Sequence, residues 1–279
     1  MGTERKRLDV ALLEAGLLAS REAARGLILA GQVLVDGQVV DKPGTKVDPE
    51  SRLEVVGPKN PYVSRGGLKL QAALEAFPVP VAGVVALDVG ASTGGFTDCL
   101  LQHGARLVYA VDVGWGQLAW KLRQDPRVHV LERTNIRYLE PEAITGESPA
   151  LATIDVSFIS LRLVLPAVHK LVLPGSPVIP LIKPQFEAGR AQVGKKGVVR
   201  DPRVHREVLY NVGDFARESG FALLGLIASP ILGPEGNREF LAWLEAIAPS
   251  PESSGRGLTP EQWRQLSDQV VQVVGESGE

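Results

Sequence analysis

The chain has 279 residues, a formal net charge of −2 and 44% hydrophobic residues, and at roughly 150 residues per domain this length predicts two domains. No apolar run approaches the ~18 residues of a membrane helix, and no apolar secretion signal follows the basic N-terminus, so we expect a cytoplasmic protein that does not enter a membrane. The single cysteine, Cys99, excludes an internal disulfide framework, and four scattered histidines show no ligand spacing, so we expect no metal.

The first 57 residues are predicted to form a compact unit of two helices followed by short strands. Ser20 is typical of a helix N-cap and Gly31 of a helix end, which places the second helix between them. Asp36-Gly37 lies between valine-rich runs, as in a β-hairpin turn. Apolar residues recur at helical spacing at Leu8, Ala11, Leu12 and Ala15, and again at Ala24, Leu27 and Ile28.

This order of elements resembles the small RNA-binding domain named after ribosomal protein S-four. The matching features are Arg5-Lys-Arg7, Ser20-Arg21 with Arg25, and the run Ala30-Gly-Gln-Val-Leu-Val-Asp-Gly37. The resemblance implies a basic face that contacts structured RNA, formed here by Arg5, Lys6, Arg7, Arg21 and Arg25. The alternative is that these residues form ordinary salt bridges on helix surfaces.

A turn-rich linker, residues 58–64, is predicted to lead into a second domain at residues 65–249. Apolar strand candidates alternate there with helical segments, which predicts an α/β fold with a mostly parallel sheet and helices on both faces. Residues 250–279 are predicted to form a flexible connection and a C-terminal helix that begins with the capping pattern Thr259-Pro-Glu-Gln262. The strand candidates are residues 84–88, 107–112, 128–131, 151–155, 178–182, 222–229 and 238–244.

The stretch Asp88-Val-Gly90-Ala-Ser-Thr-Gly94-Gly95-Phe96 follows the first of these strands and opens a helix. A glycine turn at this point forms the nucleotide-binding corner of a doubly wound sheet. Its spacing differs from the G-x-G-x-x-G of dinucleotide proteins, and its acidic residue precedes the first glycine. A carboxylate there suits a cationic, amino-acid-like ligand, so S-adenosylmethionine is the leading cofactor. Asp112, which ends the next strand, is placed to accept hydrogen bonds from ribose hydroxyls.

Positive charge is concentrated within residues 183–206, where seven cations face two acids. Contacts with phosphate groups need such a local patch rather than a basic protein. The charge alone leaves open whether this segment binds nucleic acid or is a solvated basic loop. The RNA-binding candidates taken from it are Lys195, Lys196 and Arg200.

The second domain resembles the FtsJ-like ribose methyltransferases, and the whole chain resembles the TlyA family of ribosomal RNA 2′-O-methyltransferases, sometimes labelled haemolysins. The motifs appear in the family's order across nearly the full length. They are Tyr62-Val-Ser-Arg-Gly-Gly-Leu-Lys69, the glycine stretch above, Leu131-Glu-Arg-Thr-Asn135, Asp155-Val-Ser-Phe-Ile-Ser-Leu161, Leu181-Ile-Lys183-Pro-Gln-Phe-Glu187, Val193 to Pro202 and Ser229 to Phe240.

The resemblance implies a Rossmann-like methyltransferase sheet preceded by a small α+β RNA-binding domain, and a catalytic tetrad of Lys69, Asp155, Lys183 and Glu239. A ribose 2′-hydroxyl must lose its proton as it attacks the methyl group in line, and Lys183 is the candidate base. An ammonium cannot accept a proton, so this role requires burial and a nearby cation such as Lys69. Asp155 and Glu239 oppose that effect and are assigned to orienting the lysines and the methyl donor.

The resemblance also implies the cofactor contacts, which are Asp88, Gly90, Ser92, Thr93, Gly94, Gly95, Phe96, Asp112, Asn135 and Ile136. Asp88 would serve the donor's amino group either directly or through the loop. Arg65, just past the linker, is a further RNA-binding candidate, although cofactor contact is equally open for it. The expected partner is ribosomal RNA within ribosomal subunits.

Three other functions compete with this one. An RNA-binding assembly factor with a vestigial cofactor pocket keeps the fold without the chemistry. A membrane-active haemolysin lacks support from any spanning or long apolar amphipathic segment. A nicotinamide dehydrogenase is disfavoured by the glycine spacing. Which nucleotide is modified, and whether it lies in the small or the large subunit, stays open.

Overall fold

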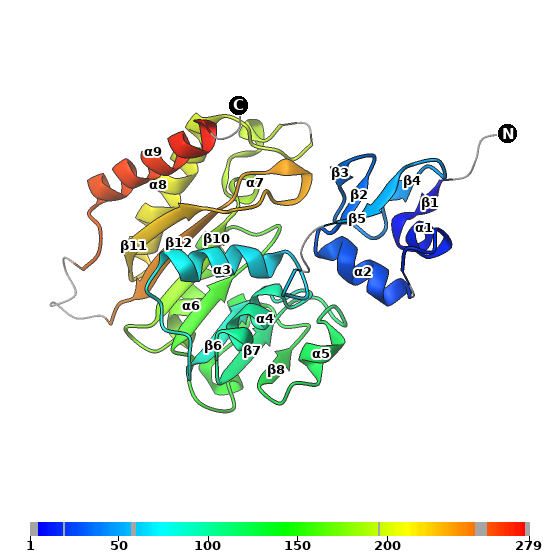
Figure 1. The fold of residues 1–279 in the computed structure, drawn as a ribbon. Helices are drawn as coiled ribbons and strands as arrows, with labels where there is room; N and C mark the ends of the chain where they lie inside the picture. The colour runs from blue at the N-terminus through cyan, green and yellow to red at the C-terminus, as the bar shows by residue number, and fades with distance from the viewer. Residues whose placement is uncertain (1–4, 19, 57–59, 195, 249–255, 277–279) are drawn as a thin grey trace.

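The structure of the protein is a computed structural model that describes residues 5–18, 20–56, 60–194, 196–248 and 256–276. Figure 1 shows residues 5–56 as a small unit, in blue, beside a larger α/β domain. The predicted linker and the predicted connection before the C-terminal helix lie partly outside the described residues, so the predicted domain boundaries stay predictions.

The small unit contains the two helices and the hairpin that the sequence predicts, and in addition a short strand, Lys6–Arg7, before the first helix. Ser20 caps α2 by accepting a hydrogen bond from the amide of Ala23 at 3.1 Å. Asp36 and Gly37 both have positive φ, 52° and 80°, which a tight hairpin turn between β2 and β3 requires. Its elements are β1 (Lys6–Arg7), α1 (Leu8–Glu14), α2 (Arg21–Leu29), β2 (Val33–Val35), β3 (Gln38–Val39), β4 (Lys46–Val47) and β5 (Leu53–Val55).

These elements enclose a small apolar core, to which both helices and two of the strands contribute. Strand β2 pairs with β3 and β5, whereas β1 pairs with β4, so two small sheets close over the helices. The fully buried core residues are Leu8, Leu12, Ala24, Ile28, Val33 and Val47. The helical spacing in the sequence therefore marked the buried positions correctly at Leu8, Leu12, Ala24 and Ile28.

The larger domain contains one seven-stranded sheet with helices on both faces. Its strands are β6 (Val85–Val89), β7 (Leu107–Val111), β8 (Val128–Leu131), β9 (Leu151–Ile154), β10 (Pro177–Ile182), β11 (Phe221–Ala228) and β12 (Phe240–Ala246). Its helices are α3 (Gly66–Ala76), α4 (Gly95–Gln102), α5 (Trp120–Arg123), α6 (Leu165–Leu171), α7 (Pro184–Glu187), α8 (Pro202–Glu218) and α9 (Pro260–Glu276), with short 3₁₀ turns at η1 (Ile136–Tyr138), η2 (Pro141–Ala143), η3 (Leu161–Leu163), η4 (Arg190–Gln192) and η5 (Pro234–Gly236). All seven predicted strands are present.

The strand order is β11-β12-β10-β9-β6-β7-β8, and every pairing from β10 to β8 is parallel. Strand β12 is antiparallel to both of its neighbours, with Ile182 of β10 opposite Phe240. Because β12 runs in reverse, its start lies at the same edge of the sheet as the carboxyl end of β10. The residue before β12, Glu239, therefore lies near Lys183, the residue after β10.

An apolar layer covers each face of the sheet and packs it against the helices. Successive side chains of β6 point into the two layers in turn. Val85, Leu87 and Val89 face a layer that includes α6, α8 and α9, whereas Ala86 faces the layer of α3, α4 and α5. Both faces of the sheet are thus covered, as a mainly parallel sheet requires.

The predicted C-terminal helix is α9, and its predicted capping box is present. The amide of Thr259 donates to the side chain of Gln262 at 2.8 Å, and the amide of Gln262 donates to the Thr259 hydroxyl at 3.2 Å. Trp263 then fills a gap against α8, where its indole donates to the carbonyl of Leu209 at 2.9 Å. The helix is part of the core of the larger domain.

Candidate functional site

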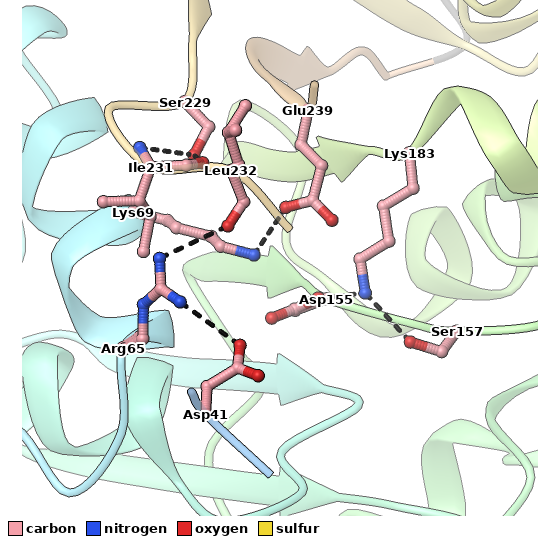
Figure 2. Close-up of polar contacts among 10 residues, drawn as sticks. All are labelled: Asp41, Arg65, Lys69, Asp155, Ser157, Lys183, Ser229, Ile231, Leu232 and Glu239. Carbon is pink, nitrogen blue, oxygen red and sulfur yellow. Dashed lines mark hydrogen bonds and ion pairs between the residues drawn. The ribbon is translucent and has the colours of Figure 1, made fainter. Parts of the chain in front are cut away.

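Four charged side chains from four different elements meet at the carboxyl edge of the sheet (Figure 2). Lys69 is on α3, Asp155 follows β9, Lys183 follows β10 and Glu239 precedes β12. The amine of Lys69 lies 2.5 Å from Glu239 Oε2, and that of Lys183 lies 2.6 Å from Asp155 Oδ1. Two ion pairs, one of which joins residues 170 positions apart in the sequence, thus share one site.

Burial makes these two pairs unlike ordinary surface salt bridges. Glu239 and Lys69 are 1% and 7% exposed, and Lys183 is 8% exposed. Burial raises the pKa of Asp155, but the positive charges of Lys183 and Lys69 outweigh burial and hold that pKa below its usual range. Glu239 Oε1 is buried without a hydrogen-bond partner among the described residues, so it is free to accept one from a ligand.

Two adjoining pockets open at this cluster. The lysine pocket, about 320 Å³, contains Lys69, Lys183 and Asp155 together with residues of the glycine loop. The Asp112 pocket, about 440 Å³, contains Asp112, Asn135 and Ile136. Four residues line both pockets, namely Gly90, Ser92, Asp155 and Ser157. A ligand in each pocket would therefore meet the other beside Asp155.

Two backbone amides hold the carboxylate of Asp112 at the wall of its pocket. Its Oδ2 accepts from the amide of Ser92 at 2.8 Å, and its Oδ1 accepts from that of Gly114 at 2.6 Å. The side chain of Asn135 caps the turn η1 by accepting from the amide of Arg137 at 3.1 Å. These contacts hold the Asp112 pocket in shape before any ligand enters.

Asp88 lies outside both pockets. It is fully buried, and its two carboxylate oxygens accept from the hydroxyls of Thr97 at 2.6 Å and Thr153 at 3.1 Å. Burial raises the pKa of Asp88 to about 7, although the two threonine hydrogen bonds lower it. Asp88 therefore lines neither pocket, and its role toward a methyl donor stays a prediction.

The glycines of the loop serve three different contacts. Gly90, with φ +86°, lies against the backbone of Asp155, and Gly94, with φ +95°, lies against the side chains of Leu118 and Leu122. Gly95 packs on Gly66 and Gly67 at the start of α3, which brings Lys69 to the site. Gly94 lines neither pocket, whereas Gly90 and Gly95 line the lysine pocket, as do Thr93 and Phe96.

Replacing Gly90 with alanine is expected to remove most of the affinity for S-adenosylmethionine. A Cβ there would lie 2.5 Å from the Asp155 carbonyl oxygen, and the positive φ adds strain of about 1 kcal/mol. The carboxyl end of β9 must shift, and both pockets shift with it. Isothermal titration calorimetry with S-adenosylmethionine measures the effect, and Gly83→Ala, at φ +77° but with nothing near its Cβ, is the matched control. Equal affinity in the two variants would contradict this account.

Some residues that shape the site were not predicted from the sequence. Ser157 accepts a hydrogen bond from the Lys183 amine at 2.9 Å, and Gln117 lines the Asp112 pocket. Leu29, Asp41 and Lys42 of the small unit line the lysine pocket. Ser157 belongs to a motif that the sequence did single out, but only the fold brings the small unit to the pocket.

Arg65 connects the small unit to this edge of the sheet. Its guanidinium donates to Asp41 at 3.2 Å and to the Leu232 carbonyl at 3.4 Å (Figure 2). Its amide donates to the Leu29 carbonyl at 3.3 Å. Lys42 also pairs with Glu235. The small unit thus contacts both sides of the lysine pocket's entrance.

The remaining RNA-binding candidates are divided between paired and unpaired cations. Arg5, Lys6, Arg7 and Arg21 pair with Asp48, Glu14, Asp9 and Asp9 respectively. Arg25 is exposed and forms no ion pair within the described part of the chain. Lys196 and Arg200 are exposed, whereas Lys195 lies outside the described residues. The salt bridges that the sequence left as an alternative therefore occur. Those of Arg5 and Lys6 join exposed partners and contribute little to stability, whereas Arg7 and Arg21 both pair with the buried Asp9.

Asp9 is expected to make the small unit sensitive to acid. Hydrogen bonds from Arg7 and Arg21 lower the pKa of this buried carboxyl to about 2 despite its burial. Because that pKa is depressed, its contribution is complete above pH ~4 and is lost as the pH falls towards 2. We expect about 1–2 kcal/mol, since both guanidinium groups are half exposed. Thermal unfolding between pH 6 and 2 should show a smaller pH dependence in Asp9→Asn, and identical curves would contradict the prediction.

Comparison with known families agrees with this architecture. The model of the FtsJ-like methyltransferase family matches residues 62–246, and that of the S4 domain matches residues 6–53. The chain belongs to the FtsJ-like methyltransferase family. The small unit is its S4 domain, and the expected methyltransferase sheet behind a small α+β domain is confirmed.

Relatives with both parts cover almost the whole of this FtsJ-like chain. The 16S/23S rRNA (cytidine-2′-O)-methyltransferase TlyA of Mycobacterium tuberculosis is 48% identical over 95% of the chain and 98% of its own length. Hemolysin A of Brachyspira hyodysenteriae is 42% identical over 85% and 98%. A solved structure of a candidate hemolysin from Streptococcus thermophilus is 46% identical, covers 99% of each chain and has a TM-score of 0.77. Within the FtsJ-like family, the chain thus belongs to the TlyA group.

Some relatives of this FtsJ-like protein are named hemolysins. Within residues 5–276, apart from the gaps named above, no helix is both long and apolar enough to cross a membrane.

Proposed function

We propose that the protein transfers a methyl group from S-adenosylmethionine to the 2′-hydroxyl of a cytidine in ribosomal RNA. The observation that carries this proposal is the pair of buried lysine–carboxylate contacts at the junction of two pockets. Methyl transfer needs two ligands in line at one point, and a charged group there to manage the departing proton. The names of the TlyA relatives support the choice of nucleotide.

The Asp112 pocket fits the methyl donor. A carboxylate at the end of β7 suits ribose hydroxyls, and Ile136 and Val113 offer apolar contact to an adenine ring. Asp155 lines both pockets, and its carboxylate suits a cationic donor. S-Adenosylmethionine supplies, when bound, an electrophilic methyl group on a positively charged sulfur.

We assign the base to Lys183. The 2′-oxygen forms a bond to the methyl carbon while the carbon–sulfur bond breaks, and the hydroxyl proton passes to the Lys183 amine. Asp155 holds this amine in place at 2.6 Å. The hydrogen bond to Ser157 orients the amine. Glu239 holds Lys69 and presents its free Oε1 to a substrate hydroxyl.

The S4 domain supports RNA as the substrate. It carries exposed cations such as Arg25, and its residues Leu29, Asp41 and Lys42 form part of the wall of the lysine pocket. Ribosomal subunits as the actual substrate, and a cytoplasmic site of action, belong to the same proposal. The relatives named for both 16S and 23S rRNA are matched over nearly their full length, whereas the relative from Campylobacter jejuni named for 23S rRNA alone is matched over 69%. Activity on both subunits is therefore the expectation.

The test uses the full chain, methyl-labelled S-adenosylmethionine and both ribosomal subunits lacking the modification. We expect label on the ribose 2′-oxygen of a cytidine, located by mass spectrometry of nuclease fragments. Label on a base would contradict the proposed chemistry. Absence of label on subunits and on naked rRNA, together with measurable cofactor binding, would favour an RNA-binding assembly factor instead.

A further inference from the structure

A groove between the two domains has an unusual lining. One wall is α2 of the S4 domain, and the other is the segment around α5 that follows β7. The groove, about 940 Å³, is lined by Trp115 and Trp120, which are 68% and 64% exposed. Large exposed aromatic side chains gathered in one groove typically mark a binding surface. We refer to it as the tryptophan groove.

The charges along the tryptophan groove are mainly positive. Arg21, Arg25 and Arg123 line it together with one acid, Glu22, and of these arginines Arg21 pairs with Asp9 and Arg123 with Glu132. Arg25 has no ion-pair partner within the described part of the chain, and so it is available to a phosphate. Arg133 adds a guanidinium 5.0 Å from the centre of the Trp115 ring, which both fixes the ring and adds positive charge.

The tryptophan groove is continuous with the lysine pocket. Leu29 of α2 and Thr93 of the glycine loop line both of them. A polymer that enters the lysine pocket with one residue can therefore continue along the groove without leaving the protein surface.

Resting on the proposed function, we propose that the tryptophan groove binds unpaired nucleotides that flank the methylated ribose. Their bases stack on Trp115 and Trp120, and their phosphates contact Arg25 and Arg21. Stacking of this kind requires free base faces, which a double helix hides. The substrate class is thus an RNA loop or single-stranded segment rather than a continuous duplex.

The experiment titrates the full-length protein with an eight-nucleotide oligocytidylate and, separately, with a duplex of the same length at the same salt concentration. Tryptophan fluorescence reports the stacking. We expect quenching by the single strand and little by the duplex. Trp120→Ala should weaken single-strand affinity by roughly tenfold or more, and Arg25→Ala should weaken it and reduce its dependence on salt.

Trp243→Phe is the control, because Trp243 lies on β12 against Phe77, away from the groove. It should bind the single strand as the unmodified protein does. Trp115→Ala is informative only if calorimetry finds its affinity for S-adenosylmethionine unchanged, since Gly114 beside it binds Asp112; otherwise Trp120→Ala decides. Absent quenching, or equal affinity in Trp120→Ala and Trp243→Phe, would overturn the proposal.

The two proposals fail separately. Single-strand binding that depends on Trp120, with no label on any rRNA, would contradict the proposed methyl transfer and support the proposed role of the groove. Methylation by Trp120→Ala with an unchanged KM for RNA would contradict the proposed role of the groove and leave the proposed methyl transfer standing.

Discussion

Lys183→Ala is expected to lower the rate of methyl transfer to ribosomal RNA by roughly a thousandfold, within the range for loss of a general base. The variant removes the amine that lies between Asp155 and Ser157 but leaves the wall of the Asp112 pocket intact. Affinity for S-adenosylmethionine should therefore change little. Single-turnover transfer of labelled methyl groups measures the rate, and calorimetry measures the affinity.

Lys183→Arg separates proton transfer from simple electrostatic attraction. Arginine keeps the positive charge but does not release its proton, so it cannot act as a base. We expect it to be as inactive as the alanine variant. Substantial activity in Lys183→Arg would show that the charge alone suffices and would contradict the assignment of the base. Ser157→Ala, which removes only the 2.9 Å hydrogen bond to the amine, should lose about tenfold or less.

Glu239→Gln is expected to reduce the free energy of unfolding by about 3–5 kcal/mol, the range for breaking a buried ion pair from one side. It leaves the charge of Lys69, which is only 7% exposed, without its ion-pair partner. Denaturant unfolding measures the loss. Methyl transfer should fall as well, because Lys69 loses its orientation and the free Oε1 is gone.

The double variant Lys69→Met with Glu239→Leu tests whether stability and activity are separate. Replacing both partners with apolar residues of similar size removes the uncompensated charge, so most of the lost stability should return. Methyl transfer should remain low, since neither charged group is present. A double variant that regains activity would show that the pair contributes only to folding.

The sequence by itself determined most of the architecture. Strand positions followed from short apolar runs, the helix starts from Ser20 and Thr259, and the hairpin from Asp36-Gly37. These signals are local, because period, capping and turn preferences act between residues close in the chain. The family motifs also singled out the four charged residues of the site, but they did not show which of these residues form ion pairs with one another.

Only the tertiary structure decided which groups touch. The reversed direction of β12 places Glu239 beside the end of β10, and no local pattern encodes that reversal. Burial removes Asp88 from the walls of the pockets, because its oxygens accept from Thr97 of α4 and Thr153 of β9. The S4 domain reaches the lysine pocket through Arg65 and Asp41, residues 24 positions apart in the chain. Contacts across such separations depend on how whole elements pack, which is why the sequence could single out candidate residues but not their geometry.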